Sequence, residues 1–203
     1  MSAIRSAAAC AARIGLMGVL LAGCATTPPA QFYTLAPLQA PEAKSVSAPR
    51  FTVAVGPVIM PELLQRPQIV TRNRDDQVNF AAFHRWAGTL ADETKRVLAV
   101  NLGTLLYEAR AVVTTDDLAI DPDRRVVVNI NRFDGVPGGA VWLNAVWTLT
   151  SRKGENTLAV HQSVIEEKMA GAAVADLVSA HSRAVGRLSR EIAAGLARTL
   201  PAP

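Results

Sequence analysis

The first 23 residues have the pattern of a segment that is removed before the protein folds. Residues 1–13 carry two positive charges, Arg5 and Arg13, and no acidic residue, and residues 14–22 form a short apolar run. This run is far below the roughly 20 apolar residues that a transmembrane helix needs. A charged segment followed by a short apolar segment is instead typical of a signal peptide. We therefore expect residues 1–23 to be removed and the fold to be built from the rest of the chain.

The apolar run ends in Leu21, Ala22, Gly23 and Cys24. This pattern resembles the lipobox of bacterial lipoproteins, in which the cysteine thiol is joined to a diacylglyceryl group and the peptide is cut just before it. The resemblance implies lipidation of Cys24 with palmitate-like chains, and two or three such chains hold a protein stably on a membrane. Ala25 follows the cysteine where lipoproteins of the inner membrane usually have aspartate, so we expect the periplasmic face of the outer membrane. The alternative is an ordinary secretory signal in which Cys24 has no role.

Removal of the signal peptide changes both the cysteine content and the charge. Cys10 would be lost and Cys24 acylated, which leaves no thiol for a disulfide, a nucleophile or a metal site. The loss of Arg5 and Arg13 lowers the formal net charge from +4 to +2. The chain also has no dense tract of lysine and arginine. We therefore expect no nucleic-acid partner.

The mature chain is predicted to be one domain on a short tether. Residues 24–31 contain the lipidated cysteine, Pro28 and Pro29, and proline favours extended backbone. Residues 32–203 are long enough for a single domain of ordinary size. Within them, residues 36–49 contain further prolines and are predicted to be a connecting loop.

The alternation of apolar and polar residues predicts an α+β fold. Two helical stripes are expected, the first beginning after Thr89, which is a good N-cap. The last three predicted strands are joined by turn signals and favour an antiparallel meander. We expect an antiparallel or mixed β-sheet with two long helices packed on one face. The predicted strands are 32–35, 51–58, 68–72, 78–80, 125–133, 141–149 and 158–169, and the predicted helices are 90–107 and 173–199.

Residue patterns that support catalysis are scarce. The histidines of the mature chain lack zinc-ligand spacing, and no nucleophile elbow or phosphate-binding loop is present. His181 lies on an apolar helix stripe and is expected in the core, and Glu166 and Glu167 should point to opposite faces of a strand. The acidic segment 116–125 could be a calcium loop, but it lacks the spacing of an EF-hand and is expected to be a solvated loop. We predict no metal, no cofactor and no enzymatic activity.

Arginine and tryptophan gather in two segments that precede the first predicted helix. Both residue types are common in the energetic centres of protein interfaces. The candidate partner interface therefore consists of Arg66, Arg72, His84, Arg85 and Trp86. Two alternatives stay open at this point: Trp86 packs into the core, or the tryptophan and arginines lie at a lipid headgroup boundary. Core packing is expected for Trp142 and Trp147.

Several short segments occur together in the order and spacing of one family. The chain resembles the PqiC or YmbA-like family of ABC-type transport auxiliary lipoproteins. Besides the lipobox, the resemblance rests on FYTL at 32–35, VGP at 55–57, RPQIVTR at 66–72, FHRW at 83–86, RFDG at 132–135 and WTL at 147–149.

The resemblance implies a role without catalysis. Members of this family are outer-membrane lipoproteins that work with a PqiB-like, periplasm-spanning MCE-domain protein and an inner-membrane transporter component. The system is thought to move lipids between membranes and to protect envelope integrity, with the lipoprotein as a docking or scaffold subunit and a ring-like homo-oligomer. One alternative is a stand-alone periplasmic lipid-binding carrier with an acyl-chain cavity. The other is an envelope hydrolase, which would need a catalytic constellation that the sequence does not display.

Overall fold

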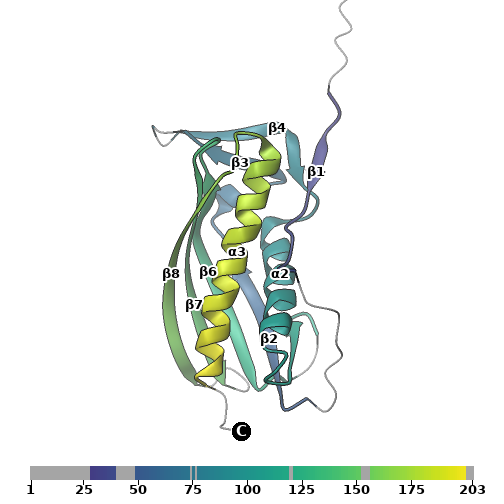
Figure 1. Ribbon diagram of the computed structural model, residues 1–203, viewed down its shortest axis with the longest axis vertical. Helices are drawn as coiled ribbons and strands as arrows, with labels where there is room; N and C mark the ends of the chain where they lie inside the picture. The colour runs from purple at the N-terminus through teal and green to yellow at the C-terminus, as the bar shows by residue number, and fades with distance from the viewer. Residues whose placement is uncertain are drawn as a thin grey trace, which may run out of the picture.

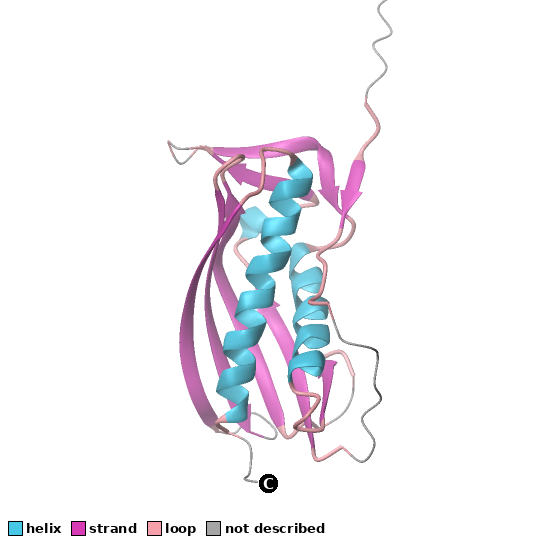
Figure 2. Cartoon of the chain, in the orientation of Figure 1, coloured by secondary structure: helices cyan, strands magenta, loops and turns pink. Residues whose placement is uncertain are grey.

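The protein has two layers, a sheet and a pair of helices that cover one of its faces (Figures 1 and 2). The computed structural model describes residues 28–39, 49–73, 75, 77–118, 121–151 and 156–199. The eight strands form one mixed sheet. The predicted α+β class, with two long helices on one face, is confirmed. The lipobox residues Leu21, Ala22, Gly23 and Cys24 lie outside the described residues, and their assignment stays a prediction.

An antiparallel meander forms one side of the sheet. It consists of β6 (Arg124–Gly135), β7 (Ala140–Ser151) and β8 (Thr157–Lys168), with β7 paired to both neighbours. The strands alternate as the sequence predicts: in β6, Val126 and Val128 are buried and Asn129 is exposed. β8 pairs only with β7 and is therefore an edge of the sheet.

The other side of β6 is shared by two groups of strands. The first half of β6 pairs in parallel with β2 (Phe51–Ile59), and β2 pairs in parallel with β5 (Ala111–Thr115). At Gly135 the far end of β6 meets β3 (Gln68–Arg72), which is antiparallel to β4 (Val78–Trp86). β1 (Gln31–Tyr33) completes this end as the parallel neighbour of β4. A short 3-10 turn, η1 (Glu62–Leu64), joins β2 to β3.

The two helices lie side by side on the sheet, as Figure 1 shows. In α2 (Leu90–Leu105) the Thr89 side chain accepts a hydrogen bond from the backbone N–H of Asp92, which confirms the predicted N-cap. α3 (Val174–Ala197) buries its apolar stripe, including Leu177, Leu188 and Ile192. The two helices and the inner face of the sheet thus enclose the core.

A polar chain of contacts attaches α3 to the meander. The indole N–H of Trp147 in β7 donates to the hydroxyl of Ser163 in β8 at 2.9 Å. Ser163 in turn donates to the carboxylate of Glu191 in α3. Core packing is confirmed for Trp147, whereas Trp142 lies on the other face of β7, where the Arg132 guanidinium is 4.7 Å from its ring centroid.

Two segments differ from the sequence prediction. β5 was not predicted, because it is a short edge strand directly after α2, although its β-branched residues 112–115 carried a signal. β4 continues to Trp86, so the segment 83–86 is strand rather than a lead into the helix. This extension matters for the candidate site, because neighbouring strand residues face opposite sides of the sheet.

Candidate functional site

The chain that follows β1 is clamped between the two helices. We call residues 34–39 the strap. Leu35 in the strap is only 1% exposed, and its backbone N–H donates to the carboxylate of Glu93 in α2 at 3.2 Å. The guanidinium of Arg96, also in α2, donates to the Leu35 carbonyl at 3.2 Å. The sequence predicts a strand to residue 35 and a connecting loop from residue 36, but β1 ends at Tyr33 and the strap is part of the packed domain.

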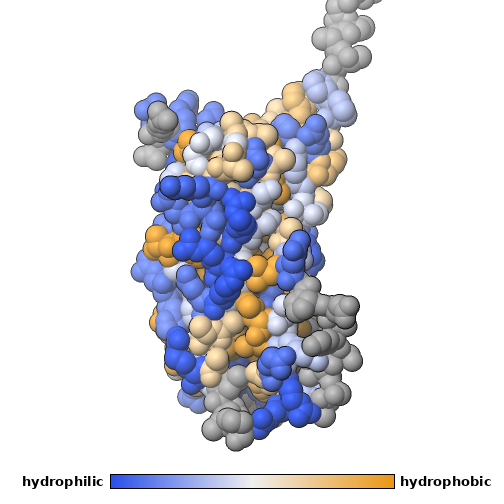
Figure 3. Space-filling model, viewed as in Figure 1, coloured by the Kyte–Doolittle hydropathy of each residue, from blue (hydrophilic) through white to orange (hydrophobic). Residues whose placement is uncertain are grey.

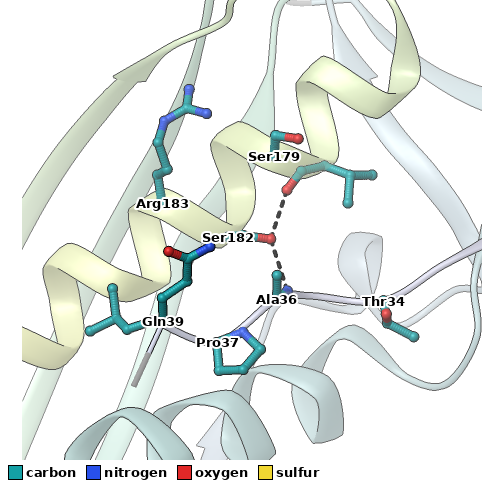
Figure 4. Close-up of a pocket in the computed structure, with 9 residues that line it drawn as sticks. Thr34, Ala36, Pro37, Gln39, Ser179, Ser182 and Arg183 are labelled. Atoms are coloured by element: carbon teal, nitrogen blue, oxygen red, sulfur yellow. Dashed lines mark hydrogen bonds between the residues drawn. The ribbon is translucent and has the colours of Figure 1, made fainter. Parts of the chain in front are cut away.

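The strap bonds to α3 as well. The backbone N–H of Ala36 donates to the hydroxyl of Ser182 at 3.0 Å, and that hydroxyl donates to the carbonyl of Val178 (Figure 4). A hollow of about 360 Å³ lies along this contact, between the strap and α3. Polar groups from Gln39, Ser182 and Arg183 are among its lining, as Figure 4 shows. The rest of the lining is largely apolar and includes Pro37, Leu38 and Val178.

β1 and β4 form the end of the molecule where the N-terminal chain enters. Their register pairs Phe32 with Arg85 and Tyr33 with Trp86. The Tyr33 hydroxyl also lies 2.9 Å from Nδ1 of His84. Because side chains alternate along a strand, His84 and Trp86 share one face of β4 and Arg85 faces the other.

A second hollow, of about 370 Å³, opens at this end, and we call it the β1-end hollow. Its arginines are Arg66, which precedes β3, and Arg85 in β4. The Nε of Arg66 donates to the carbonyl of Leu63 at 3.2 Å, and its guanidinium lies 4.0 Å from the ring centroid of Phe80. The Nε of Arg85 is buried and has no hydrogen-bond partner among the described residues. The full lining is Phe32, Gln65, Arg66, Pro67, Arg85, Trp86, Ala87, Gly88 and Thr89.

The five residues predicted as a partner interface therefore separate into different roles. Trp86 is 3% exposed and packs edge-on against His181, so the core alternative describes it. Arg72 forms an ion pair at 2.9 Å with Asp134, whose side chain is buried. Only Arg66, Arg85 and part of Trp86 meet at one hollow. That these residues contact a partner stays a prediction.

His181 lies at the centre of the core, as the sequence predicts. Its ring is 4.6 Å from the ring of Phe133, and its Nδ1 is 2.9 Å from the carbonyl of Leu177. Burial lowers the pKa of His181 to about 4, because the charged imidazolium would lose its hydration. His181 is therefore neutral at neutral pH and has a structural role.

Acidic residues considered for a calcium loop or an acid/base pair form ion pairs or lie exposed on separate faces. Lys95 in α2 lies 2.9 Å from the carboxylate of Asp117 and 3.3 Å from that of Asp116. The hydrogen bond with Asp117 raises the pKa of Lys95. Glu167 pairs with Arg183 of α3, whereas Glu166 is exposed on the opposite face. Within the part of the chain that the structure describes, no group of three or more potential ligands could hold a metal ion.

The helices give no evidence of a membrane-spanning segment. Neither α2 nor α3, nor any other described helix, is long and apolar enough to cross a bilayer.

Residues 33–193 match the sequence model of a family described as the ABC-type transport auxiliary lipoprotein component. The chain belongs to this family. The match begins in β1 and ends within α3, so it covers the strap, the sheet and both helices. It confirms the resemblance that the sequence segments indicate. The protein is thus an auxiliary lipoprotein component of ABC-type transport systems, a class whose role is not catalytic. No curated protein sequence matches the chain.

Two solved structures share the fold of this auxiliary lipoprotein. One, of an uncharacterized protein, has a TM-score of 0.69 at 20% identity and covers 83% of this chain and 99% of its own. The other is XCC0632 from Xanthomonas campestris, of the family DUF330, with a TM-score of 0.64 at 12% identity, covering 84% of this chain and 100% of its own. At these identities the likeness shows the common architecture alone.

Proposed function

We propose that this auxiliary lipoprotein is the outer-membrane subunit of an MCE-type, Pqi-like system that moves lipids between the two membranes. In this proposal Cys24 is acylated, and the domain has a docking or scaffold role on the periplasmic face of the outer membrane. Its partners are a PqiB-like MCE-domain protein that spans the periplasm and an inner-membrane transporter component. The protein contributes position and contact surface rather than chemistry.

The observation that carries this proposal is the path of the chain from the anchor into the core. Cys24 precedes Pro28, the first described residue, by four residues, which an extended chain spans in at most about 14 Å. From there the chain forms β1 and then the strap, which both helices hold by hydrogen bonds. An acylated Cys24 would therefore keep the whole domain close to the membrane. Such an arrangement suits a docking subunit.

The open edges of the sheet support a homo-oligomer. β8 is a long edge strand, and Leu158, Val160 and Val164 are exposed along it. Edge strands with exposed apolar side chains are normally covered by another element or chain. β5 is a second edge at another side of the same sheet. If the β8 edge of one copy contacts the β5 edge of the next, the interface is heterologous. Interfaces of this kind can close a ring of copies around a partner.

The decisive experiment is recovery of partners from envelope membranes. The native lipoprotein should be purified with its acyl chains and the co-eluting proteins identified. We expect an MCE-domain protein in the eluate, and its absence under conditions that keep the envelope complex intact would contradict the proposal. A matched pair of variants tests the anchor: Cys24→Ala should abolish acylation and membrane retention, whereas Cys10→Ala, within the predicted signal peptide, should not.

A further inference from the structure

The β1-end hollow combines an arginine without a partner, a second arginine and exposed aromatic rings beside the strand nearest to the anchor. We propose that it binds an anionic phospholipid headgroup of the surrounding membrane through its phosphate. The inference rests on the proposed function, because acylation of Cys24 is what brings this end of the domain to a membrane. It adds a specific lipid contact that the acyl anchor alone does not supply.

Arg85 is partly exposed and can bind an anion from outside the protein. No hydrogen bond or ion pair joins its guanidinium to any described residue, and its Nε is buried. A buried N–H without a partner costs free energy, and an anionic ligand that reaches the guanidinium gains a charge-assisted hydrogen bond. The planar guanidinium matches the geometry of a phosphate. Arg66 lines the same hollow and supplies the second positive charge.

Two acidic residues in the first turn of α2, after the lining residue Thr89, already have partners. Asp92 in the first turn of α2 accepts a hydrogen bond from the Thr89 hydroxyl at 2.7 Å, and Glu93 is paired with Arg96 at 2.8 Å. Neither carboxylate is bonded to Arg85 among the described residues. Thr89, the N-cap of α2, lies in the lining, and the N-terminal end of a helix favours a negative ligand.

Exposed aromatic rings near the hollow suit the boundary of a bilayer. Phe32 is 65% exposed and is the register partner of Arg85, and Phe83, two residues before Arg85 in the same strand, is 38% exposed. Exposed phenyl rings of a surface-bound protein can bury apolar area at the boundary between headgroups and acyl chains. Figure 3 shows apolar surface gathered at the end of the molecule where β1 lies. A carboxylate of a protein partner would also satisfy Arg85, but the exposed rings and the few residues that separate Phe32 from Cys24 in the sequence favour a lipid.

The test uses the processed lipoprotein in micelles of a maltoside detergent, which contains no phosphate. Isothermal titration calorimetry would measure the binding of short-chain phosphatidylglycerol and, separately, of inorganic phosphate. We expect phosphatidylglycerol to bind, and Arg85→Gln and Arg66→Gln each to weaken it by about 5- to 10-fold, as loss of a charge-assisted hydrogen bond predicts. Arg190→Gln is the matched control: it removes the same charge from an exposed site on α3, and the change should stay below about 2-fold.

Several outcomes would overturn the lipid site. If Arg190→Gln weakens phosphatidylglycerol binding as much as Arg85→Gln does, the attraction is nonspecific. If the protein binds inorganic phosphate but not phosphatidylglycerol, the hollow is a site for the free ion. Loss of the co-purified protein partner in Arg85→Gln, with unchanged lipid binding, would assign the hollow to that partner. Melting curves of each variant confirm folding, and Arg85→Gln should melt no lower than the parent protein, because it removes an unpartnered charge. The proposed function is tested separately, by the mass of the acyl group on Cys24 and by recovery of the protein partner.

Discussion

The backbone N–H of Leu38 in the strap donates a hydrogen bond of 2.7 Å to the side-chain carbonyl of Asn101 in α2. Asn101 is fully buried, and its amide donates to the hydroxyl of Ser189 in α3 at 2.9 Å. The Ser189 hydroxyl donates onward to the carbonyl of Val185. One side-chain amide thus connects the strap with both helices.

Replacing this amide should destabilise the protein. We expect Asn101→Ala to lower the free energy of unfolding by about 2–3 kcal/mol, because it removes the acceptor of the partly buried Leu38 N–H and opens a small void at the fully buried Asn101 site. Urea unfolding followed by circular dichroism measures the change. Asn129→Ala, at an exposed position of β6, is the control and should cost less than about 0.5 kcal/mol. A loss at Asn101 as small as the control would mean that the strap is held by other contacts.

Two helical glycines should respond in opposite directions to the same change. A methyl group at Gly195 in α3 would lie 2.7 Å from the indole of Trp147, whereas one at Gly103 in α2 would meet nothing within 4 Å. We expect Gly195→Ala to lower the melting temperature, because the rigid indole in the core must shift. Gly103→Ala should raise stability by about 0.5–1 kcal/mol through helix propensity. Stabilisation by both substitutions would show that Trp147 has room to move.

Buried His181 should make the protein sensitive to acid. The pKa of His181 falls from its usual 6.5 to about 4 on folding, because of burial. Between these two values the unfolded chain binds a proton that the folded chain does not, so stability declines as the pH falls from about 6.5 to about 4. The decline attributable to this group is on the order of 3 kcal/mol and levels off below pH 4.

The comparison of unfolding curves across this pH range isolates the contribution of His181. His181→Leu should flatten the dependence of unfolding free energy on pH, even where its absolute stability is lower. Asn129→Ala, which changes no titratable group, should leave the slope close to that of the parent protein. If His181→Leu retains the full slope, other groups cause the acid sensitivity.

The exposed face of β8 should control self-association. We expect the double variant Val160→Lys and Val164→Lys to lower the molecular mass in light scattering to that of a monomer, because charges on an edge strand oppose pairing. Val100→Lys, at an exposed apolar position of α2, tests whether any added charge has this effect. Monomeric behaviour of the unmodified acyl-free domain at high concentration would contradict the homo-oligomer itself.

The sequence predicts what depends on neighbouring residues and misses what depends on distant pairing. Alternation and turn residues predict β6, β7 and β8, and Thr89 with its following acids predicts the start of α2. The parallel pairing of β2 with β5 and β6 has no local signal, because each partner lies 60 or more residues away. The sequence places Arg72 in a partner interface for the same reason, because its ion-pair partner Asp134 lies far along the chain and leaves no local signal.

The candidate site shows a similar division. Local composition locates the segment 83–86, but strand alternation turns Trp86 into the core, although it also borders the hollow, and turns Arg85 to the other face of β4. Periodicity predicts His181 in the core, since it shares the apolar stripe of α3. Burial of Leu35 between the helices follows only from their packing. The proline-rich surroundings of the strap suggest a loop and give no sign of this contact.

The placement of β1 determines how the domain would respond to mechanical force. β1 runs parallel to β4 over three residue pairs and continues into the strap. A pull from the N-terminus acts along the length of β1, so its backbone bonds and those of the strap share the tension at the same time instead of opening one by one. A partner that pulls on the domain while the bilayer holds its N-terminus would then move the domain as a unit before it unfolds.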